Sequence, residues 1–381
     1  MNSKIQACFL FALMISFSLG GCLSEEVITA AENEDACSAD IQIRESDGTL
    51  KILTYDIAGF SDELIAQFVA ESGVSVEFTR ADDAGGILDQ MMLTKSAPLA
   101  DLMIGLDNTY LPTAIQNCLL MEHSVSDENF TESSLEFYHG ALAIPFDEGE
   151  VCLNYDEDAL TAANMSVPTS LWDLTQPEWN GKMTFPSPMT SSPGRAFLAA
   201  TVDYFSQAPG NGSGNMSSWW NAIAQNGAIF TSGWTESYVT YYTGGYGEYM
   251  EGHIGGAYLT VSYCHSPGVE AYYAENYTHS TSLVLPRASF HQVEYTGIIN
   301  GAAEVSAANQ FIEFLTSYDV NVNMPDYNSM YSVKNGTDLP ETNGYRYHAD
   351  QASLSSNITQ DAIEQNMDAW LASWQTAVQM N

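Results

Sequence analysis

Three aspartates stand shortly after apolar runs of the sequence, where buried strands would end. They are Asp56, Asp107 and Asp147. The carboxyl ends of neighbouring parallel strands form a common rim, so these carboxylates could neutralise a cation or accept a hydrogen bond from an amine there. The alternative is a local role, because Asp frequently caps helices and shapes turns.

A run of hydroxyl residues precedes a predicted helix over residues 196–205. It consists of Thr190, Ser191 and Ser192, followed by Pro193-Gly194. Hydroxyl groups and free backbone N–H groups at the amino end of a helix can bind an anion. The alternative is an ordinary helix cap with proline in the first turn.

The elements that position these groups follow a regular order. Apolar patterns predict strands over 50–55, 74–79 and 100–105, and helices over 62–72 and 87–94. Alternation of strand and helix indicates right-handed crossovers and a parallel sheet, so the fold class is α/β. Ligands of such sheets bind beyond the carboxyl ends of the strands.

Further elements are predicted later in the chain. Two strands, 141–146 and 151–155, are separated by Asp147-Glu148-Gly149, and another strand covers 255–263. Helices are expected over 309–318 and 359–379.

The net charge of the chain limits the classes of partner that it could bind. It has 381 residues with 48 acidic and 10 basic side chains, a net charge of −38. Nucleic acids and anionic membrane surfaces are therefore poor partners, whereas a cationic ligand or a salty extracellular medium fits. Since 45% of the residues are hydrophobic, the chain can bury a large core.

The amino-terminal segment resembles the signal peptide of a lipoprotein. Residues 7–19 are apolar, and small residues precede Cys22. We expect a signal peptide over 1–21, lipid attachment at Cys22, and an acidic tether over 22–44. The protein would then lie on the outer, periplasmic or extracellular, face of the cytoplasmic membrane. A plain secretory signal is the alternative.

Four further cysteines, Cys37, Cys118, Cys152 and Cys264, could form two disulfide bonds in an oxidising compartment. Three pairings are possible, and the sequence does not choose between them. No CxxC pair occurs, which argues against a structural zinc site.

Short motifs along most of residues 50–378 resemble the thiamine-binding proteins of ABC importers, within the type II periplasmic-binding-protein family. The motifs, in chain order, are Thr54-Tyr55-Asp56, Gly105-Leu106-Asp107-Asn108, Pro145-Phe146-Asp147-x-Gly149, Asn154-Tyr155-Asp156, Ser187-Pro188-x-Thr190-Ser191-Ser192-Pro193-Gly194, Gly233-Trp234-Thr235-Glu236-Ser237-Tyr238, Ser262-Tyr263-x-x-Ser266-Pro267, Asn328-x-Met330-Tyr331-x-Val333 and Ala369-Trp370-x-x-x-Trp374.

This resemblance implies two α/β lobes joined by hinge strands, with the ligand cleft between them. Lobe 1 would comprise 45–145 plus 295–381, and lobe 2 would comprise 146–294. The ligand would be thiamine, whose permanent thiazolium cation suits carboxylates and aromatic faces. The residues implied in binding are Tyr55, Asp56, Asp107, Asp147, Thr190, Ser191, Ser192, Trp234, Ser262, Tyr263 and Tyr331.

The sequence departs from the family pattern at three places, one of which is the loop after Asp56, where the family's tryptophan and Gly-Pro-Gly are missing. Met189 stands where the family has an arginine, which favours free thiamine over its phosphates, with Arg195 as the candidate replacement. Ser329 stands where the family has a tryptophan, and Tyr327 could supply the missing aromatic wall.

Other functions remain open. A ferric-iron binder of the same fold could use Tyr241, Tyr242, Tyr263 and His265. A polyamine binder would also suit an acidic cleft, and a tethered receptor could present its ligand to a sensor. An anchored hydrolase is disfavoured because no catalytic motif occurs. The expectation is a monomeric binding protein without catalysis, cofactor or metal, which delivers its ligand to a membrane permease.

Overall fold

The computed structural model describes residues 37, 41–207, 215–243, 255–349 and 354–379. The predicted signal peptide, Cys22 and most of the tether lie outside these residues. No helix among the described residues combines the length and apolar character needed to cross a bilayer.

The first part of the chain forms the predicted parallel strands and crossover helices. These are β1 (Thr49–Tyr55), α2 (Asp62–Ser72), β2 (Ser75–Ala81), α3 (Ala84–Leu93) and β3 (Leu102–Asp107). Strand β1 pairs in parallel with β2 on one side and β3 on the other. Every residue of β3 is buried, as expected for a parallel strand that is covered on both faces.

Local sequence signals set the bounds of the two helices. The Ser61 hydroxyl accepts from the backbone N–H of Leu64 and caps α2, and Gly73 ends that helix in the left-handed conformation. Asp83 caps α3 by accepting from the N–H of Ala84 at 2.8 Å. This cap starts α3 three residues before the predicted helix.

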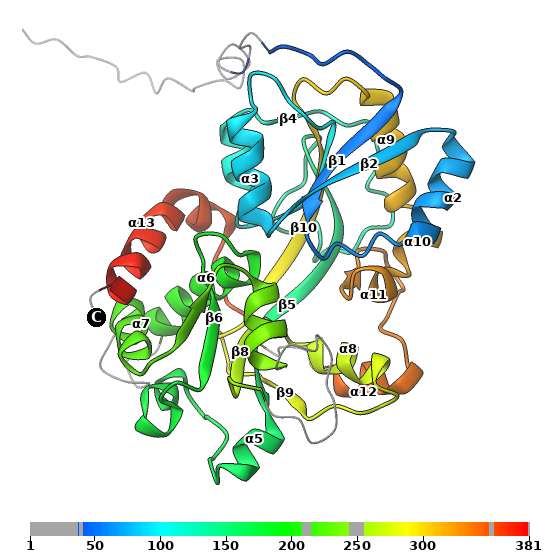
Figure 1. The fold of residues 1–381 in the computed structure, drawn as a ribbon. Coiled ribbons are helices and arrows are strands. Elements are labelled where there is room, and N and C mark those ends of the chain that lie inside the picture. Colours follow the sequence, from blue (N-terminus) through cyan, green and yellow to red (C-terminus); the bar gives the residue numbers. More distant parts are fainter. Residues whose placement is uncertain (1–36, 38–40, 208–214, 244–254, 350–353, 380–381) are drawn as a thin grey trace, which may run out of the picture. The chain divides into compact units, whose positions relative to one another are not determined.

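The middle of the sheet contains long antiparallel strands. After α4 (Leu111–Gln116) and β4 (Leu120–Met121), the chain forms β5 (Ile144–Asp156), which pairs with β10 (Phe290–Ile299) and with β11 (Tyr331–Ser332). Figure 1 shows β5 and β10 running between the group that contains β1 and β2 and the group that contains β6 and β8.

The prediction of two strands broken at Asp147-Glu148-Gly149 is wrong. These residues lie within the single strand β5, because neighbouring strands on both sides satisfy their backbone groups. Glu148 pairs with Val293 of β10 and with Tyr331 of β11. Polar side chains in the sequence therefore marked a polar stretch of strand rather than its end.

The second group of strands extends the sheet. It contains β6 (Met183–Pro186), β7 (Ile229–Thr231), β8 (Leu259–Tyr263) and β9 (Ser280–Leu283), and α5 (Glu157–Ala162) follows β5. The main order of the sheet is β2-β1-β3-β10-β5-β8-β6-β7, with β4, β9 and β11 paired off this path.

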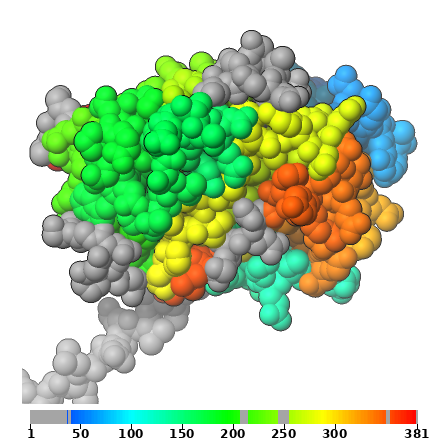
Figure 2. Space-filling view, turned by 90° about the horizontal axis from the view of Figure 1, so that it is seen from below, coloured from blue at the N-terminus to red at the C-terminus, as the bar shows by residue number. Residues whose placement is uncertain are grey.

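Helices cover the sheet. Those that matter for the site or the core are α6 (Ser192–Gln207), α7 (Met216–Gln225), η3 (Glu236–Tyr242, a π-helix), α8 (Ser266–Tyr273) and α13 (Gln360–Gln379). The remaining helices are η1 (Leu171–Thr175), η2 (Pro177–Trp179), α9 (Val305–Leu315), α10 (Tyr318–Asn321), α11 (Met324–Tyr327), η4 (Thr342–Gly344) and α12 (Tyr345–His348). Helix α12 packs on α8, and Figure 2 shows the orange surface that includes α12 beside the yellow surface of the preceding segments.

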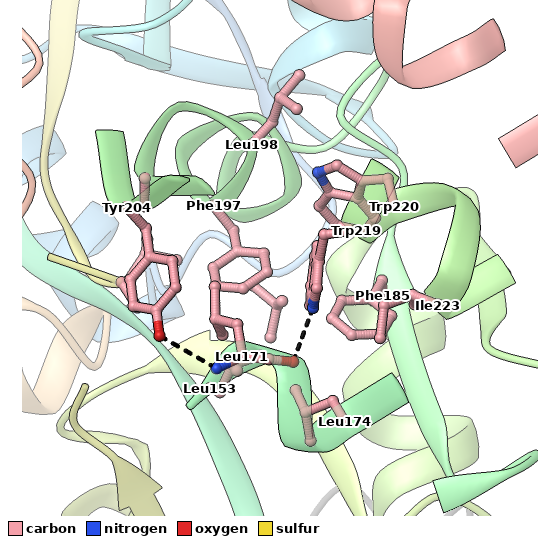
Figure 3. Close-up of a cluster of buried hydrophobic side chains, with 14 of the residues drawn as sticks. Leu153, Leu171, Leu174, Phe185, Phe197, Leu198, Tyr204, Trp219, Trp220 and Ile223 are labelled. Atoms are coloured by element: carbon pink, nitrogen blue, oxygen red, sulfur yellow. Dashed lines mark hydrogen bonds between the residues drawn. The ribbon is translucent and has the colours of Figure 1, made fainter. Parts of the chain in front are cut away.

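An aromatic core supports α6 and α7. Figure 3 shows Phe185, Phe197, Trp219 and Trp220 packed together, with the Trp219 indole N–H donating to the carbonyl of Leu171 at 2.7 Å. Each buried aromatic ring contributes about 2–3 kcal/mol to folding. This core holds α6, and with it the hydroxyl run at its amino end, in a fixed position.

Helix α13 belongs to the same core. Trp374 packs edge-on against Trp220, with ring centroids 6.2 Å apart, and α13 contacts α6 and α7. The predicted lobe 1 includes residues 295–381, yet α13 packs in the core of α6 and α7; the division into lobes itself stays a prediction. A separate core packs α2 and α9 against β1 and β3, with Phe68 and Phe311 rings 4.8 Å apart.

A disulfide bond joins Cys152 of β5 to Cys264, two residues before α8. Cys37 and Cys118 are also disulfide-bonded. All four cysteines that could form disulfides are therefore disulfide-bonded, and the structure shows Cys152–Cys264 among the pairings that the sequence left open.

Candidate functional site

A cavity of about 320 Å³ lies where the ends of several of these elements meet. It is bordered by the end of β1, the amino ends of α3 and α6, the start of η3, helix α8 and the segment before β11. The lining residues are Tyr55, Asp56, Ile57, Asp82, Asp83, Gly105, Ser192, Pro193, Trp234, Thr235, Tyr238, Tyr263, Ser266, Val269, Glu270, Tyr273, Glu294, Tyr327, Asn328, Ser329 and Met330.

The charged residues of the lining are all acidic. They are Asp56, Asp82, Asp83, Glu270 and Glu294, and among the residues that the structure describes neither a lysine nor an arginine lines the cavity. Burial raises the pKa of Asp56 and Asp83, and it raises that of Glu270 and Glu294 well above the ordinary value. A cation that entered the cavity would relieve this electrostatic penalty, since it favours the ionised carboxylates.

A hydrogen-bonded network around Tyr55 forms the floor. The Tyr55 hydroxyl donates to Oε2 of Glu294 at 2.9 Å and accepts from Nδ2 of Asn328 at 2.6 Å. The same Asn328 nitrogen lies 2.6 Å from Oδ2 of Asp147. Gly105 has φ +104°, and a Cβ at this position would collide with the Tyr55 ring, so only glycine lets the ring lie here.

Strand β10 continues this network to Tyr263. Gln292 and Glu294 lie on the same face of β10, and Nε2 of Gln292 donates to Oε1 of Glu294 at 3.0 Å. That nitrogen also donates to the Tyr263 hydroxyl at 3.1 Å. Tyr55 and Tyr263, which come from different parts of the sheet, are thus positioned by a single strand.

Trp234 and Tyr238 form an aromatic wall. Their rings are stacked with centroids 4.7 Å apart and planes 13° apart. The Trp234 indole N–H donates to the Ser262 hydroxyl at 2.9 Å, which fixes the ring orientation. The Tyr238 hydroxyl donates to Glu270, so a carboxylate lies directly behind the aromatic wall.

The amino end of α6 closes another side of the cavity. The backbone N–H of Ser192 donates to Oδ1 of Asp83 at 3.1 Å, and its hydroxyl donates to Asp107. The Thr190 hydroxyl donates to the carbonyl of Ser232 at 2.5 Å. The hydroxyl run predicted to bind an anion is therefore largely engaged by groups of the chain itself.

The fold and this site can be compared with known proteins. The model of the family described as bacterial extracellular solute-binding protein matches residues 63–327, more than half of the chain. The chain belongs to this family. The family assignment places the protein outside the cytoplasm, as a binding protein that serves a transporter.

Relatives and solved structures agree with this assignment. The thiamine-binding periplasmic protein of Escherichia coli is 24% identical over 314 residues, which cover 82% of this chain and 86% of that protein. A solved periplasmic thiamin binding protein has a TM-score of 0.72 at 22% identity and covers 88% of this chain and 99% of its own. A ferric binding protein from Campylobacter jejuni has a TM-score of 0.65 at 15% identity, with 86% and 99% covered. The predicted type II periplasmic-binding-protein fold is confirmed.

Five of the residues predicted to bind the ligand of this solute-binding protein line the cavity. They are Tyr55, Asp56, Ser192, Trp234 and Tyr263. Trp234 lies in the helical turn directly before η3. Contact of these five residues with a ligand remains a prediction.

The other six predicted residues do not line the cavity. Asp107 is buried behind Ser192, and Asp147 is buried behind Asn328. Tyr331 packs against the ring of His265. Thr190, Ser191 and Ser262 also lie outside the lining. Three of the six support lining residues: Asp107 bonds to Ser192, Asp147 to Asn328 and Ser262 to Trp234. Position in the sequence cannot distinguish such support from direct contact with a ligand.

The replacements suggested for the departures at Met189 and Ser329 differ in whether they reach the cavity. Arg195 does not replace a phosphate-facing arginine, because its guanidinium lies 3.7 Å from the centre of the Tyr110 ring and its Nε donates to the carbonyl of Pro188. Tyr327 and Ser329 both line the cavity, so Tyr327 is placed to act as the expected aromatic wall.

Sequence reasoning missed several acidic and polar lining residues of this solute-binding protein. Asn328 and Tyr238 stood within the quoted motifs, and that position was the available signal. Asp83 gave only the signal of a helix cap. Glu270 and Glu294 gave no such signal, because Glu270 lies within a helix and Glu294 within a strand.

The four residues proposed for ferric iron do not form one ligand cluster, although the rings of Tyr263 and His265 lie 5.4 Å apart. The Tyr242 hydroxyl bonds to Ser280 at 2.7 Å, and Nε2 of His265 lies 2.7 Å from the carbonyl of Ser329. Of the four candidates, only Tyr263 lines the cavity. Among the described residues, no group of three or more His, Cys, Asp or Glu side chains is placed to hold a metal ion.

Proposed function

We propose that this solute-binding protein captures thiamine outside the cytoplasm and delivers it to the permease of an ABC importer. The observation that carries the proposal is a cavity with stacked aromatic residues on one side and only acidic charged residues in its lining. A permanent cation cannot lose its charge on burial, so its site must supply compensation. Aromatic faces contribute about 0.5–2 kcal/mol each by cation–π contact, and carboxylates supply the remainder.

The proposed mechanism uses no chemistry on the ligand. Thiamine would enter between lobes that close by hinge motion about β5 and β10, and the permease would receive it from the closed form. The protein would act as a monomer without cofactor or metal, tethered by a lipid on Cys22. The relatives named for thiamine binding support the ligand, and the apolar run before Cys22 supports the anchor.

A polyamine is the second candidate ligand, because five carboxylates in one cavity also suit a flexible polycation. The aromatic wall favours thiamine, since a flat ring gains more from stacking than an alkyl chain does.

The test is calorimetric titration of the full chain with thiamine, spermidine and Fe(III). We expect thiamine to bind with a dissociation constant near 1 nM, about −12 kcal/mol, and to displace any bound spermidine. An absence of heat with thiamine at micromolar protein, together with tight spermidine binding, would transfer the function to polyamines.

A further inference from the structure

Asp83 lies where the amino ends of α3 and α6 meet. Its Oδ1 accepts from the backbone N–H of Ala84 at 2.8 Å and from that of Ser192 at 3.1 Å. Its Oδ2 accepts from the backbone N–H of Trp234 at 3.3 Å. One carboxylate therefore holds N–H groups from three separate segments of the chain.

The two helix ends approach each other closely around this carboxylate. The N–H of Gly85 donates to the carbonyl of Thr190 at 3.0 Å, and a Cβ on Gly85 would overlap the Thr190 backbone. The space between α3 and α6 is thus filled by the chain itself, and Asp83 is the anionic group in it.

The N–H groups that Asp83 holds are those that a phosphate would need. The amino end of a helix binds phosphate through free N–H groups and the positive end of the helix dipole. At α6 the Ser192 N–H is already bonded to Asp83. The one arginine of the first turn, Arg195, lies over the Tyr110 ring and cannot contribute a charge to the cavity.

Electrostatic repulsion also disfavours a phosphate in this cavity. A phosphate monoester carries about −1.5 to −2 charges at neutral pH. In this cavity it would lie beside Asp56, Asp82 and Asp83 with no basic side chain in the lining. Like charges placed together at a binding interface are strongly unfavourable.

We propose that Asp83 makes the cavity selective for the unphosphorylated cation, by occupying the anion-binding end of α6 and repelling phosphate esters of the ligand. This inference rests on the proposed function, because it specifies which chemical form of thiamine is accepted. Asp83 acts as a specificity-determining residue, and its carboxylate takes the place of a ligand phosphate.

The first experiment compares thiamine, thiamine monophosphate and thiamine diphosphate by calorimetric titration of the full chain. We expect the monophosphate to bind at least about tenfold more weakly than thiamine, and the diphosphate to bind more weakly still. Equal or tighter binding of either phosphate would overturn the inference and leave thiamine capture intact. If none of the three binds, the proposed function fails and the inference fails with it.

The second experiment uses paired variants, Asp83→Ala and Asp82→Ala. Both remove one carboxylate from the lining, but only Asp83 holds the N–H groups of Ser192 and Trp234. We expect Asp83→Ala to reduce the preference for thiamine over its monophosphate by about tenfold or more, and Asp82→Ala to change it by less than about threefold. Equal changes in both variants would show a general charge effect and refute the specific role.

Asp83 also caps α3, so its replacement by alanine carries a risk of misfolding. Asp83→Asn keeps the shape of the side chain and one acceptor oxygen while removing the charge. Thermal unfolding and thiamine affinity establish that each variant is folded. We expect Asp83→Asn to reduce the preference in the same direction by a smaller factor; an unchanged preference in a folded Asp83→Asn that still binds thiamine would contradict the electrostatic part of the inference.

Discussion

Asp83 and Glu270 line the same cavity, but different groups hold their carboxylates. Three backbone N–H groups donate to Asp83, whereas the hydroxyl groups of Tyr238 and Thr278 donate to Glu270. Burial raises the pKa of both carboxyls, but the donated N–H bonds counteract the rise at Asp83, and the pKa of Glu270 lies well above its ordinary value.

The difference teaches that one cavity can hold two kinds of acidic residue. A backbone N–H can only donate, so a cluster of such groups favours an ionised carboxylate. A hydroxyl can donate or accept, so it accommodates a protonated carboxyl as well. The donors around Asp83 therefore favour its ionised form, whereas the strongly raised pKa of Glu270 makes this carboxyl harder to ionise, and a cation bound nearby would favour its ionisation.

Trp234 links Asp83 to Glu270, and removal of its ring should have the largest effect on thiamine affinity. Its backbone N–H serves Asp83, while its ring stacks on Tyr238, whose hydroxyl donates to Glu270. Trp234→Ala keeps the N–H and loses the ring, so we expect thiamine affinity in calorimetry to fall about a hundredfold. The preference for thiamine over its monophosphate should not change.

Trp234→Phe is the matched control for this variant. It keeps an aromatic face but loses the indole N–H bond to Ser262. We expect a loss of about tenfold, smaller than that of the alanine variant. Normal thiamine binding by Trp234→Ala would remove this ring from the site.

Glu270→Gln tests the part of the comparison that depends on pH. Because the pKa of Glu270 is raised, a cation that favours the carboxylate must displace a proton in mildly acidic solution. Wild-type affinity should therefore increase with pH until the raised pKa is passed. We expect the variant to bind about tenfold more weakly than wild type at pH 8 and about twofold more weakly at pH 5.

Glu270→Gln should also change how the free energy of unfolding depends on pH. The folded state binds the Glu270 proton more tightly than the unfolded state, whose pKa is near 4.5. The free energy of unfolding of the ligand-free protein should fall as the pH rises from 4.5 through the raised pKa. Thermal unfolding of wild type and Glu270→Gln should therefore diverge with rising pH in favour of the variant; parallel curves would contradict a raised pKa.

Thr278→Val should have the smallest effect. The Thr278 hydroxyl donates to Oε2 of Glu270 at 2.8 Å and stabilises the ionised form. Its loss should move the pH midpoint of thiamine binding upward and weaken affinity at pH 7 by about twofold. Thr281→Val is the control, because its hydroxyl donates to the distant Glu157 at an exposed position. If the pH midpoint of thiamine binding moved equally in both variants, the hydrogen bond from Thr278 to Glu270 would not be its cause.

Much of the fold could be predicted from the sequence, since its signals are local. Helix α2 has the predicted bounds, 62–72, because Ser61 and Gly73 cap its two ends. Strand β5 was divided in the prediction because its polar residues resemble a turn until β10 and β11 are seen beside them. Pairing partners distant in sequence leave no local signal.

The candidate site was predicted in part for a related reason. Tyr55, Trp234 and Tyr263 lie in motifs whose spacing is visible in the sequence, and all three line the cavity. Asp107 and Asp147 lie in two further motifs, but their side chains are buried behind the lining residues Ser192 and Asn328. Whether a strand-end carboxylate faces a cavity or supports a neighbour depends on side-chain direction, which a motif does not encode.

Helix α13 has a consequence for the order in which the protein matures. Trp374 completes the aromatic core around Trp220 and Phe230, although it is made long after them. Until α13 has been made, this apolar surface lacks part of its cover and is open to aggregation. The half of the protein that carries α6 can therefore acquire its final packing only after the last helix of the chain is available.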